Sequence, residues 1–267
     1  MKAIRVLFAA ILFAAMGFGA PAGATAFTTD QSDLWWDPAE SGWGIQFVHR
    51  GPVMFATIFV YDGTNTPIWY TATLFSVGDL LWSGDLYLTS GPWLGTVPFN
   101  PNAVGQRKVG SMTWHATTTR TGALNYGVDG VAVAKNLMRQ FIVNEDYSGH
   151  YGGGIHVDTT GCLNPAFNGT TENLGILDIV QSGQAVTLKT FPSTLGSCSY
   201  SGTLNQAGQM GAVNGTYLCG NGENGIFQLF EMQVNITGVT GRLTTDSNTS
   251  VGCQSTGWFG GMRILTF

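Results

Sequence analysis

The chain is built from short apolar or alternating runs separated by turn-forming residues, and this pattern constrains its fold most. Residues 53–61 form one such run, which ends at Asp62-Gly63, and residues 67–75 form the next. Runs of this length between turn signals are typical of β-strands. No window carries apolar residues at helical spacing, and the 38 glycines would destabilise helices. We therefore expect an all-β protein.

Consecutive strands with short connections favour antiparallel meanders, and meanders close readily into barrels. We expect two consecutive antiparallel meander barrels, with β-sandwiches as the main alternative. The pair Asp129-Gly130 predicts a tight hairpin turn. The expected strands are residues 53–61, 67–75, 80–88, 109–117, 123–128 and 131–135 in the first half, and 147–158, 174–181, 185–191, 199–204, 212–218, 225–236, 241–245 and 257–265 in the second.

Alternation within residues 225–236 predicts which side chains of that strand point to the core. Ile226, Phe230 and Met232 share one parity, whereas Glu231 has the other. We expect the apolar set to pack a core and Glu231 to face water or a cavity.

Composition changes near residue 142 and predicts two domains. Seven of the eight tryptophans precede this point, and all four cysteines follow it. We place the boundary in the short polar link 142–146. Residues 27–142 then form an aromatic-rich β-meander domain, and residues 143–267 form a Gly-rich, disulfide-containing, barrel-like domain.

The first 26 residues have the pattern of an export signal. Lys2 and Arg5 precede the apolar run 6–18, and Ala24-Thr25-Ala26 supplies a small-residue cleavage site. The run is shorter than the roughly 18 residues of a membrane-spanning helix, and no later run reaches that length. We expect residues 1–26 to be a signal peptide, and the mature protein to be periplasmic or extracellular with no transmembrane helix.

The charge of the mature chain argues against polyanionic partners. Lys2 and Arg5 are two of the 11 Lys and Arg residues, so the mature chain keeps nine against 16 Asp and Glu, a net charge of −7. A mildly acidic chain without a basic cluster is a poor candidate for nucleic-acid binding.

The four cysteines predict two disulfides, because the set is even and the protein is expected to be exported. Cys198 and Cys219 flank a predicted hairpin with Gly208 near its centre, which would bring them together at its open end. Cys162 then pairs with Cys253 by elimination. A four-cysteine metal site is disfavoured because no C-x-x-C spacing occurs.

The densest motif lies at residues 34–44, which read L-W-W-D-P-A-E-S-G-W-G. Y-D-G at 61–63, P-I-W-Y at 67–70 and K-N-L-M-R-Q at 135–140 follow. Together they resemble a secreted bacterial domain, common in proteobacteria, that opens on W-W-x-P-x-E-S-G-W-G. The resemblance covers residues 33–142. It implies a domain without an established activity that occurs beside other secreted modules, including proteases, and hence an accessory role.

Two interpretations of this motif are open. In the structural one, Trp35, Trp36 and Trp43 form an aromatic plug at one barrel end, and Glu40 caps backbone N–H groups of the turn. In the functional one, exposed indole faces stack on sugar rings while Glu40, Asp37 or Asp85 binds hydroxyls. The candidate ligand-binding residues are Trp35, Trp36, Glu40, Trp43 and Trp69.

Catalytic signatures are weak. The sequence contains no G-x-S-x-G, no H-E-x-x-H and no phosphate-binding glycine loop. A hydrolase that uses Glu40 or Glu231 stays open, because paired carboxylates meet only in space. His150, His156 and Asp158 would share a face of one unbroken strand and suit a metal, but the three glycines at 152–154 favour a bulge that breaks this register.

We therefore expect an exported, non-enzymatic binding or accessory module that binds a glycan or a small ligand through aromatic side chains, without a metal or other cofactor. A secreted hydrolase and a structural cell-envelope protein are the alternatives.

Overall fold

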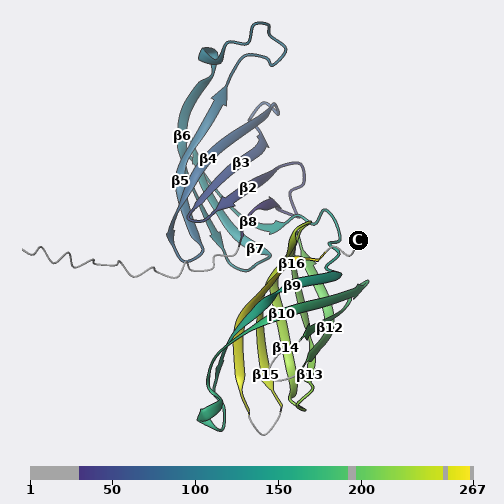
Figure 1. The fold of residues 1–267 in the computed structure, drawn as a ribbon. Coiled ribbons are helices and arrows are strands. Elements are labelled where there is room, and N and C mark those ends of the chain that lie inside the picture. The colour runs from purple at the N-terminus through teal and green to yellow at the C-terminus, as the bar shows by residue number, and fades with distance from the viewer. Residues whose placement is uncertain (1–29, 192–196, 249–251, 265–267) are drawn as a thin grey trace, which may run out of the picture.

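Figure 1 shows a computed structural model of the chain, which describes residues 30–191, 197–248 and 252–264. Two closed antiparallel barrels of eight strands each follow one another along the chain. The all-β prediction is confirmed, and the meanders close into barrels rather than sandwiches. The expected signal peptide lies outside the described residues. No helix among those residues is long and apolar enough to cross a membrane.

The first barrel is coloured purple to teal in Figure 1. Its strands are β1 (Asp33–Trp36), β2 (Gly44–Arg50), β3 (Val53–Tyr61), β4 (Pro67–Gly78), β5 (Leu81–Ser90), β6 (Gly105–Ala116), β7 (Thr121–Val128) and β8 (Val131–Arg139). Each strand pairs with the next, and β8 closes onto β1. The 3-10 helix η1 (Pro101–Ala103) lies in the long connection between β5 and β6.

Alternation along these strands fills the first barrel with large apolar side chains. Trp35, Trp82 and Trp114 are fully buried, and the rings of Trp35 and Trp114 meet edge to face with centroids 4.7 Å apart. Gln31 forms hydrogen bonds to two of these indoles. Its backbone oxygen accepts a hydrogen bond from Trp35 Nε1 at 3.0 Å, and its side-chain oxygen accepts one from Trp114 Nε1 at 3.3 Å. These three tryptophans are therefore core residues.

The second barrel is coloured green to yellow in Figure 1. Its strands are β9 (Gly149–Thr160), β10 (Gly169–Ser182), β11 (Ala185–Phe191), β12 (Cys198–Ala207), β13 (Met210–Cys219), β14 (Asn224–Val234), β15 (Gly238–Ser247) and β16 (Gln254–Arg263). β16 closes onto β9, and the 3-10 helix η2 (Pro165–Phe167) lies between β9 and β10. The domain boundary predicted at residue 142 falls in the segment 140–148 that joins β8 to β9.

Both predicted disulfide pairings are confirmed, and they lie at the same end of the second barrel. Cys198 begins β12 and Cys219 ends β13, so the two residues are direct cross-strand partners. Cys162 follows β9 and bonds to Cys253, which precedes β16. This disulfide-bearing end points away from the first barrel (Figure 1).

A β-bulge in β14 overturns the predicted facing of that strand. The register of β14 against β15 shifts between Phe230 and Gln233, and Glu231 takes a left-handed φ of 52°. Met232 faces the core, but Ile226 and Phe230 lie on the outer side, and Ile226 is 54% exposed. The prediction failed because a bulge reverses the parity of every residue beyond it.

The turn between β12 and β13 contacts the first barrel. Gln209 donates from its backbone nitrogen to Asp33 Oδ2 at 3.0 Å and from Nε2 to the Ser32 oxygen at 2.6 Å. Arg120, in the turn before β7, donates to Asn205 Oδ1 at 3.1 Å. The mouth of the second barrel is at its other end, which carries the two disulfides.

Candidate functional site

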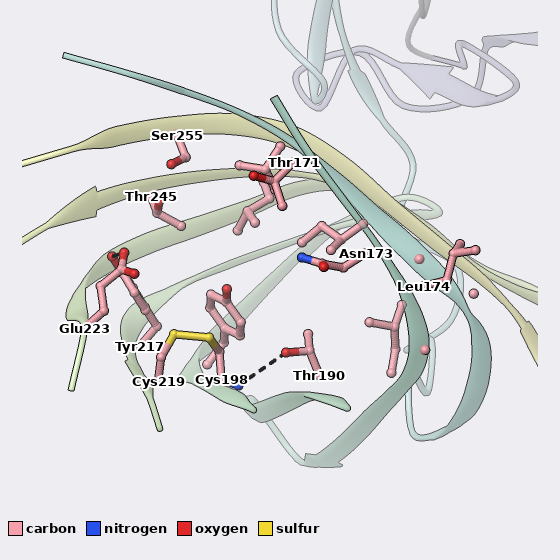
Figure 2. A pocket seen from close by; sticks show the side chains of 18 of the residues that line it. Thr171, Asn173, Leu174, Thr190, Cys198, Tyr217, Cys219, Glu223, Thr245 and Ser255 are labelled. Carbon is pink, nitrogen blue, oxygen red and sulfur yellow. Dashed lines mark hydrogen bonds between the residues drawn. A yellow bond between two sulfur atoms is a disulfide. The ribbon is translucent and has the colours of Figure 1, made fainter. Parts of the chain in front are cut away.

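A cavity of about 140 Å³ lies in the mouth of the second barrel, at the disulfide-bearing end (Figure 2). Its deeper part is apolar and includes Ile155, Leu177 and Leu243. Its upper part is polar and includes the side chains of Thr171, Asn173, Thr190, Thr245 and Ser255. This division follows from the strands, whose inward positions carry aliphatic residues in the barrel and hydroxyl residues near the strand ends.

The wall of the cavity is held by short cross-strand contacts. The hydroxyl oxygens of Thr159 and Ser255 are 3.0 Å apart across the closing pair of strands. The Thr190 hydroxyl accepts a hydrogen bond from the Cys198 backbone nitrogen at 3.3 Å, and the Cys198–Cys219 disulfide forms part of the same wall (Figure 2). These contacts stabilise the strand ends that form the mouth.

Several polar side chains line the cavity without a hydrogen-bond partner among the described residues, among them Tyr200 and Asn173. Tyr200, an inward-facing residue of β12, is only 8% exposed. Asn173 extends its side-chain amide from β10 into the cavity (Figure 2). A ligand that forms a hydrogen bond to either group would gain about 0.5–1.5 kcal/mol for each bond.

A tyrosine–glutamate pair gives the mouth its charge. The Tyr217 hydroxyl donates to Glu223 Oε1 at 3.0 Å, and the Tyr217 ring stacks on Tyr200 with centroids 5.5 Å apart. Burial, and then the negative charge of Glu223, raises the pKa of Tyr217 to about 12. Burial also raises the pKa of Tyr200. Both phenols therefore stay neutral and keep their protons at physiological pH, beside one carboxylate.

The five ligand-binding residues predicted from the sequence all lie in the first barrel, away from this cavity. Trp35 is fully buried, so neither face of its indole is open to a sugar. Trp36 has the opposite parity on β1 and is half-buried, while Trp43 packs against the core. The predicted plug of three tryptophans does not form, because alternation sends neighbouring side chains to opposite faces.

Glu40 and Trp43 do come together, with Lys135 of β8. The Lys135 ammonium donates to Glu40 Oε1 at 2.6 Å, and Trp43 Nε1 donates to Glu40 Oε2 at 3.2 Å. The hydrogen bond from Lys135 is the main cause that lowers the pKa of Glu40. Glu40 thus forms an ion pair rather than the predicted cap, and Asp37 is the capping residue, accepting from the Ala39 nitrogen at 2.9 Å.

The two ends of the sequence motif meet where the first barrel closes. Trp35 is the register partner of Arg139, and Trp36 is the partner of Met138. The Arg139 side chain is fully buried; it donates to the Thr119 oxygen at 2.6 Å and to Asp33 Oδ2 at 3.3 Å. The motif residues therefore hold the seam between β1 and β8.

Trp69 is the one predicted ligand residue with a widely open indole. It is 55% exposed on the outer face of β4, opposite Phe59 in the register. Its Nε1 donates to Thr89 Oγ1 at 3.0 Å, which holds the ring in place. Asp85, a suggested partner for sugar hydroxyls, instead forms a salt bridge with Lys108 at 2.8 Å.

Glu231 and the histidines lie outside the cavity. Glu231 is buried beside Arg242, with Oε2 and Nε 3.3 Å apart. β9 runs unbroken through its three glycines, contrary to the expected bulge, but His150 contacts Asp178 whereas His156 Nδ1 lies 3.0 Å from Glu172 Oε1. Within the described residues, no group of three or more His, Cys, Asp or Glu is arranged to hold a metal ion.

Sequence reasoning missed the cavity because each of its polar residues is unremarkable alone. They come from almost every strand of the barrel, and only closure brings them together. One signal existed: hydroxyl residues take the inward parity at the same end of three strands, as Thr190, Thr245 and Ser255 show.

Comparison of this chain with protein-family models, with curated proteins and with solved structures finds no match.

Proposed function

We propose that this protein is an exported, non-enzymatic binding module that holds a small ligand in the mouth of its second barrel. The observation that carries the proposal is a cavity with an apolar floor and a polar rim, lined by Tyr200 and by the Asn173 amide, neither of which has a side-chain hydrogen-bond partner among the described residues. Concave apolar sites with a few oriented polar groups are the usual form of small-molecule sites.

Export is supported by chemistry that suits an oxidising compartment. All four cysteines are paired, and both bridges brace the end of the barrel that holds the cavity. Disulfides persist outside the cytoplasm and are rare within it. Sequencing the N-terminus of the mature protein recovered from periplasm or medium tests this part, and a chain that still starts at Met1 would contradict it.

The alternative of a hydrolase gains no support from the two carboxylates it would use. Glu40 is exposed and paired with Lys135, and Glu231 lies beside Arg242. A glycoside hydrolase needs two carboxyl groups that face each other across a cleft, and neither glutamate lines the cavity.

Cyclohexanol is a suitable probe of the proposed site, because it combines a compact apolar ring with one hydroxyl. We expect titration to shift the backbone amide signals of Thr190, Tyr200 and Thr245 in NMR spectra. Ser255→Trp fills the mouth and should abolish these shifts. Thr256→Trp, which places the same indole on the outer face of the same strand, should leave them unchanged. Shifts confined to the first barrel, or none, would contradict the proposal.

A second candidate is glycan binding on the outer face of the first barrel, favoured by the exposed and anchored indole of Trp69. Indole faces suit the apolar side of a pyranose ring. The test is a tryptophan-fluorescence titration against a glycan panel with Trp69→Ala, and Trp258→Ala as the matched exposed indole of the second barrel. A response that survives Trp69→Ala would remove this candidate.

A further inference from the structure

We infer that the ligand of the second-barrel cavity is a small cationic amphiphile, with an ammonium group bound at Glu223 and a compact apolar group inside the barrel. This inference rests on the function proposed above and adds the chemical class of the ligand. It follows from the charge, the size and the aromatic lining of the cavity, taken in turn.

The cavity is negatively charged. Glu223 is the only residue with a charged side chain that lines it among the described residues, and no salt bridge joins Glu223 to a Lys, Arg or His in that part of the chain. Residues 192–196 and 249–251, which the structure does not describe, include no charged residue in the sequence. A carboxylate in a partly enclosed site, without a protein cation, favours a cationic ligand and disfavours an anion.

The Glu223 carboxylate also has accepting capacity left over. Its Oε1 accepts from Tyr217, and Oε2 accepts from no donor among the described residues. A carboxylate accepts several hydrogen bonds, and an ammonium group donates three. Additional acceptors on the cavity wall are the Thr245 hydroxyl and the Asn173 side-chain oxygen. The rim therefore offers acceptors to a donor-rich head group.

Aromatic rings stand next to this carboxylate. The stacked rings of Tyr200 and Tyr217 line the cavity, and Phe227 meets Tyr200 edge to face at 5.2 Å. The faces of aromatic rings attract cations, most strongly where water is excluded. A carboxylate beside tyrosine rings is thus better suited to an organic cation than to a neutral sugar.

The apolar part sets the size of the ligand. The cavity of about 140 Å³ ends on Ile155, Leu177 and Leu243. An apolar cavity of about 150 Å³ accommodates a molecule the size of benzene. The whole ligand, head group included, should accordingly be about the size of a six-membered ring with one small substituent.

The test compares three molecules of one shape by calorimetric titration of the oxidised full chain at neutral pH. Cyclohexylamine is cationic, cyclohexanol is neutral and cyclohexanecarboxylate is anionic. We expect the amine to bind about tenfold more tightly than the alcohol, the scale of one charge-assisted hydrogen bond, and the carboxylate to bind weakest.

Three variants locate the effect. Glu223→Gln should weaken amine binding about tenfold and leave cyclohexanol binding unchanged. Glu172→Gln removes a carboxylate from the outer face of β10 and should change neither. Tyr217→Phe keeps the charge of Glu223 and should keep the preference for the amine, which also guards against a Glu223 variant that fails to fold.

The outcomes separate this inference from the proposed function. Equal binding of amine and alcohol, insensitive to Glu223→Gln, would overturn the inference and leave a binding cavity in place. If cyclohexanecarboxylate bound most tightly of the three compounds, the inference of a cationic ligand would likewise be wrong, and the binding cavity would remain. Failure of all three compounds to bind would overturn both.

Discussion

At the residue scale, Arg139 shows how one side chain can hold a barrel closed. It ends β8 and lies over the Trp35 ring, with its guanidinium carbon 4.5 Å from the ring centroid. Burial lowers the pKa of this guanidinium, while the charges of Asp33, Asp30 and Glu231 raise it. A buried cation of this kind is tolerated because carbonyl oxygens and carboxylates surround it.

Arg139→Met should therefore destabilise the first barrel strongly. Removal of one partner from a buried charge network costs about 3–5 kcal/mol. Arg107→Met is the matched control. Arg107 pairs with Asp129 at 2.6 Å, but both side chains are more than half exposed, so the free energy of unfolding should change little. Urea unfolding followed by tryptophan fluorescence measures both variants, and equal midpoints for the two would contradict the role given to Arg139.

Tyr217 should report the charge of the cavity through its titration. Burial and Glu223 raise its pKa from 10.0 to about 12. Because the folded-state pKa lies above the unfolded value, its contribution to stability is complete below pH 10 and is lost as the pH rises through 12. The loss at pH 12 is on the order of 2 kcal/mol.

The titration is followed by tyrosine absorbance and by thermal unfolding between pH 8 and pH 12. Glu223→Gln should lower the Tyr217 pKa, because both the charge and the hydrogen bond of the carboxylate favour the protonated phenol. An unchanged Tyr217 titration in Glu223→Gln would show that the carboxylate does not act on this end of the barrel.

At the scale of elements, the sequence predicted strands and hairpins well wherever alternation and turn chemistry agreed. The tight turn at Asp129-Gly130 is present, with φ of 49° and 88°, and the hairpin around Gly208 brings Cys198 and Cys219 into register. Prediction failed where a local irregularity or closure decides the outcome. The bulge at Glu231 left no mark in the hydrophobic pattern, and the pairing of β1 with β8 depends on residues a hundred positions apart.

The same limit applies to the site. Tryptophan density drew attention to the first barrel, where most indoles turned out to fill a core or a seam. The cavity arose where strands carry Thr, Ser and Asn, residues common on any β surface. Only the closure of β16 onto β9 determines that these side chains point inward.

The two disulfides should differ in strength, because they close loops of different length. Cys162–Cys253 spans 91 residues and Cys198–Cys219 spans 21. In the chain-entropy account, 1.5RT ln(91/21) makes the longer bridge worth about 1.3 kcal/mol more. Paired Cys→Ala variants of each bridge, unfolded in urea, test this order.

Reduction of both disulfides should loosen the second barrel more than the first, as measured by hydrogen exchange of the backbone amides. Equal loss of protection from exchange in both barrels would contradict this.

At the scale of the whole molecule, the two barrels are joined by polar contacts rather than by a shared core. Gln206 bonds to the connecting segment at Glu145 and Val143, and Gln233 Nε2 lies 3.4 Å from Asp30 Oδ2. The buried apolar residues instead form two separate clusters, one in each barrel. Polar interfaces of this kind allow domains to move relative to each other unless specific contacts fix them.

Gly208 offers a way to loosen this contact without disturbing either core. Its φ is 56°, and a Cβ atom there would lie 2.2 Å from Asp33 Oδ2, the atom that accepts from Gln209 and Arg139. Gly208→Ala should therefore separate the turn from the first barrel and increase the radius of gyration measured by small-angle scattering. Gly183→Ala is the matched control, because Gly183 has a φ of 60° in the neighbouring hairpin turn but a Cβ there meets no atom within 4 Å. Both variants carry a similar backbone strain of about 1 kcal/mol, so only the lost contact distinguishes them. If the two variants had the same radius of gyration, the turn at Gly208 would not be what holds the barrels together. The cavity lies at the far end of the second barrel, so both variants should still bind cyclohexanol.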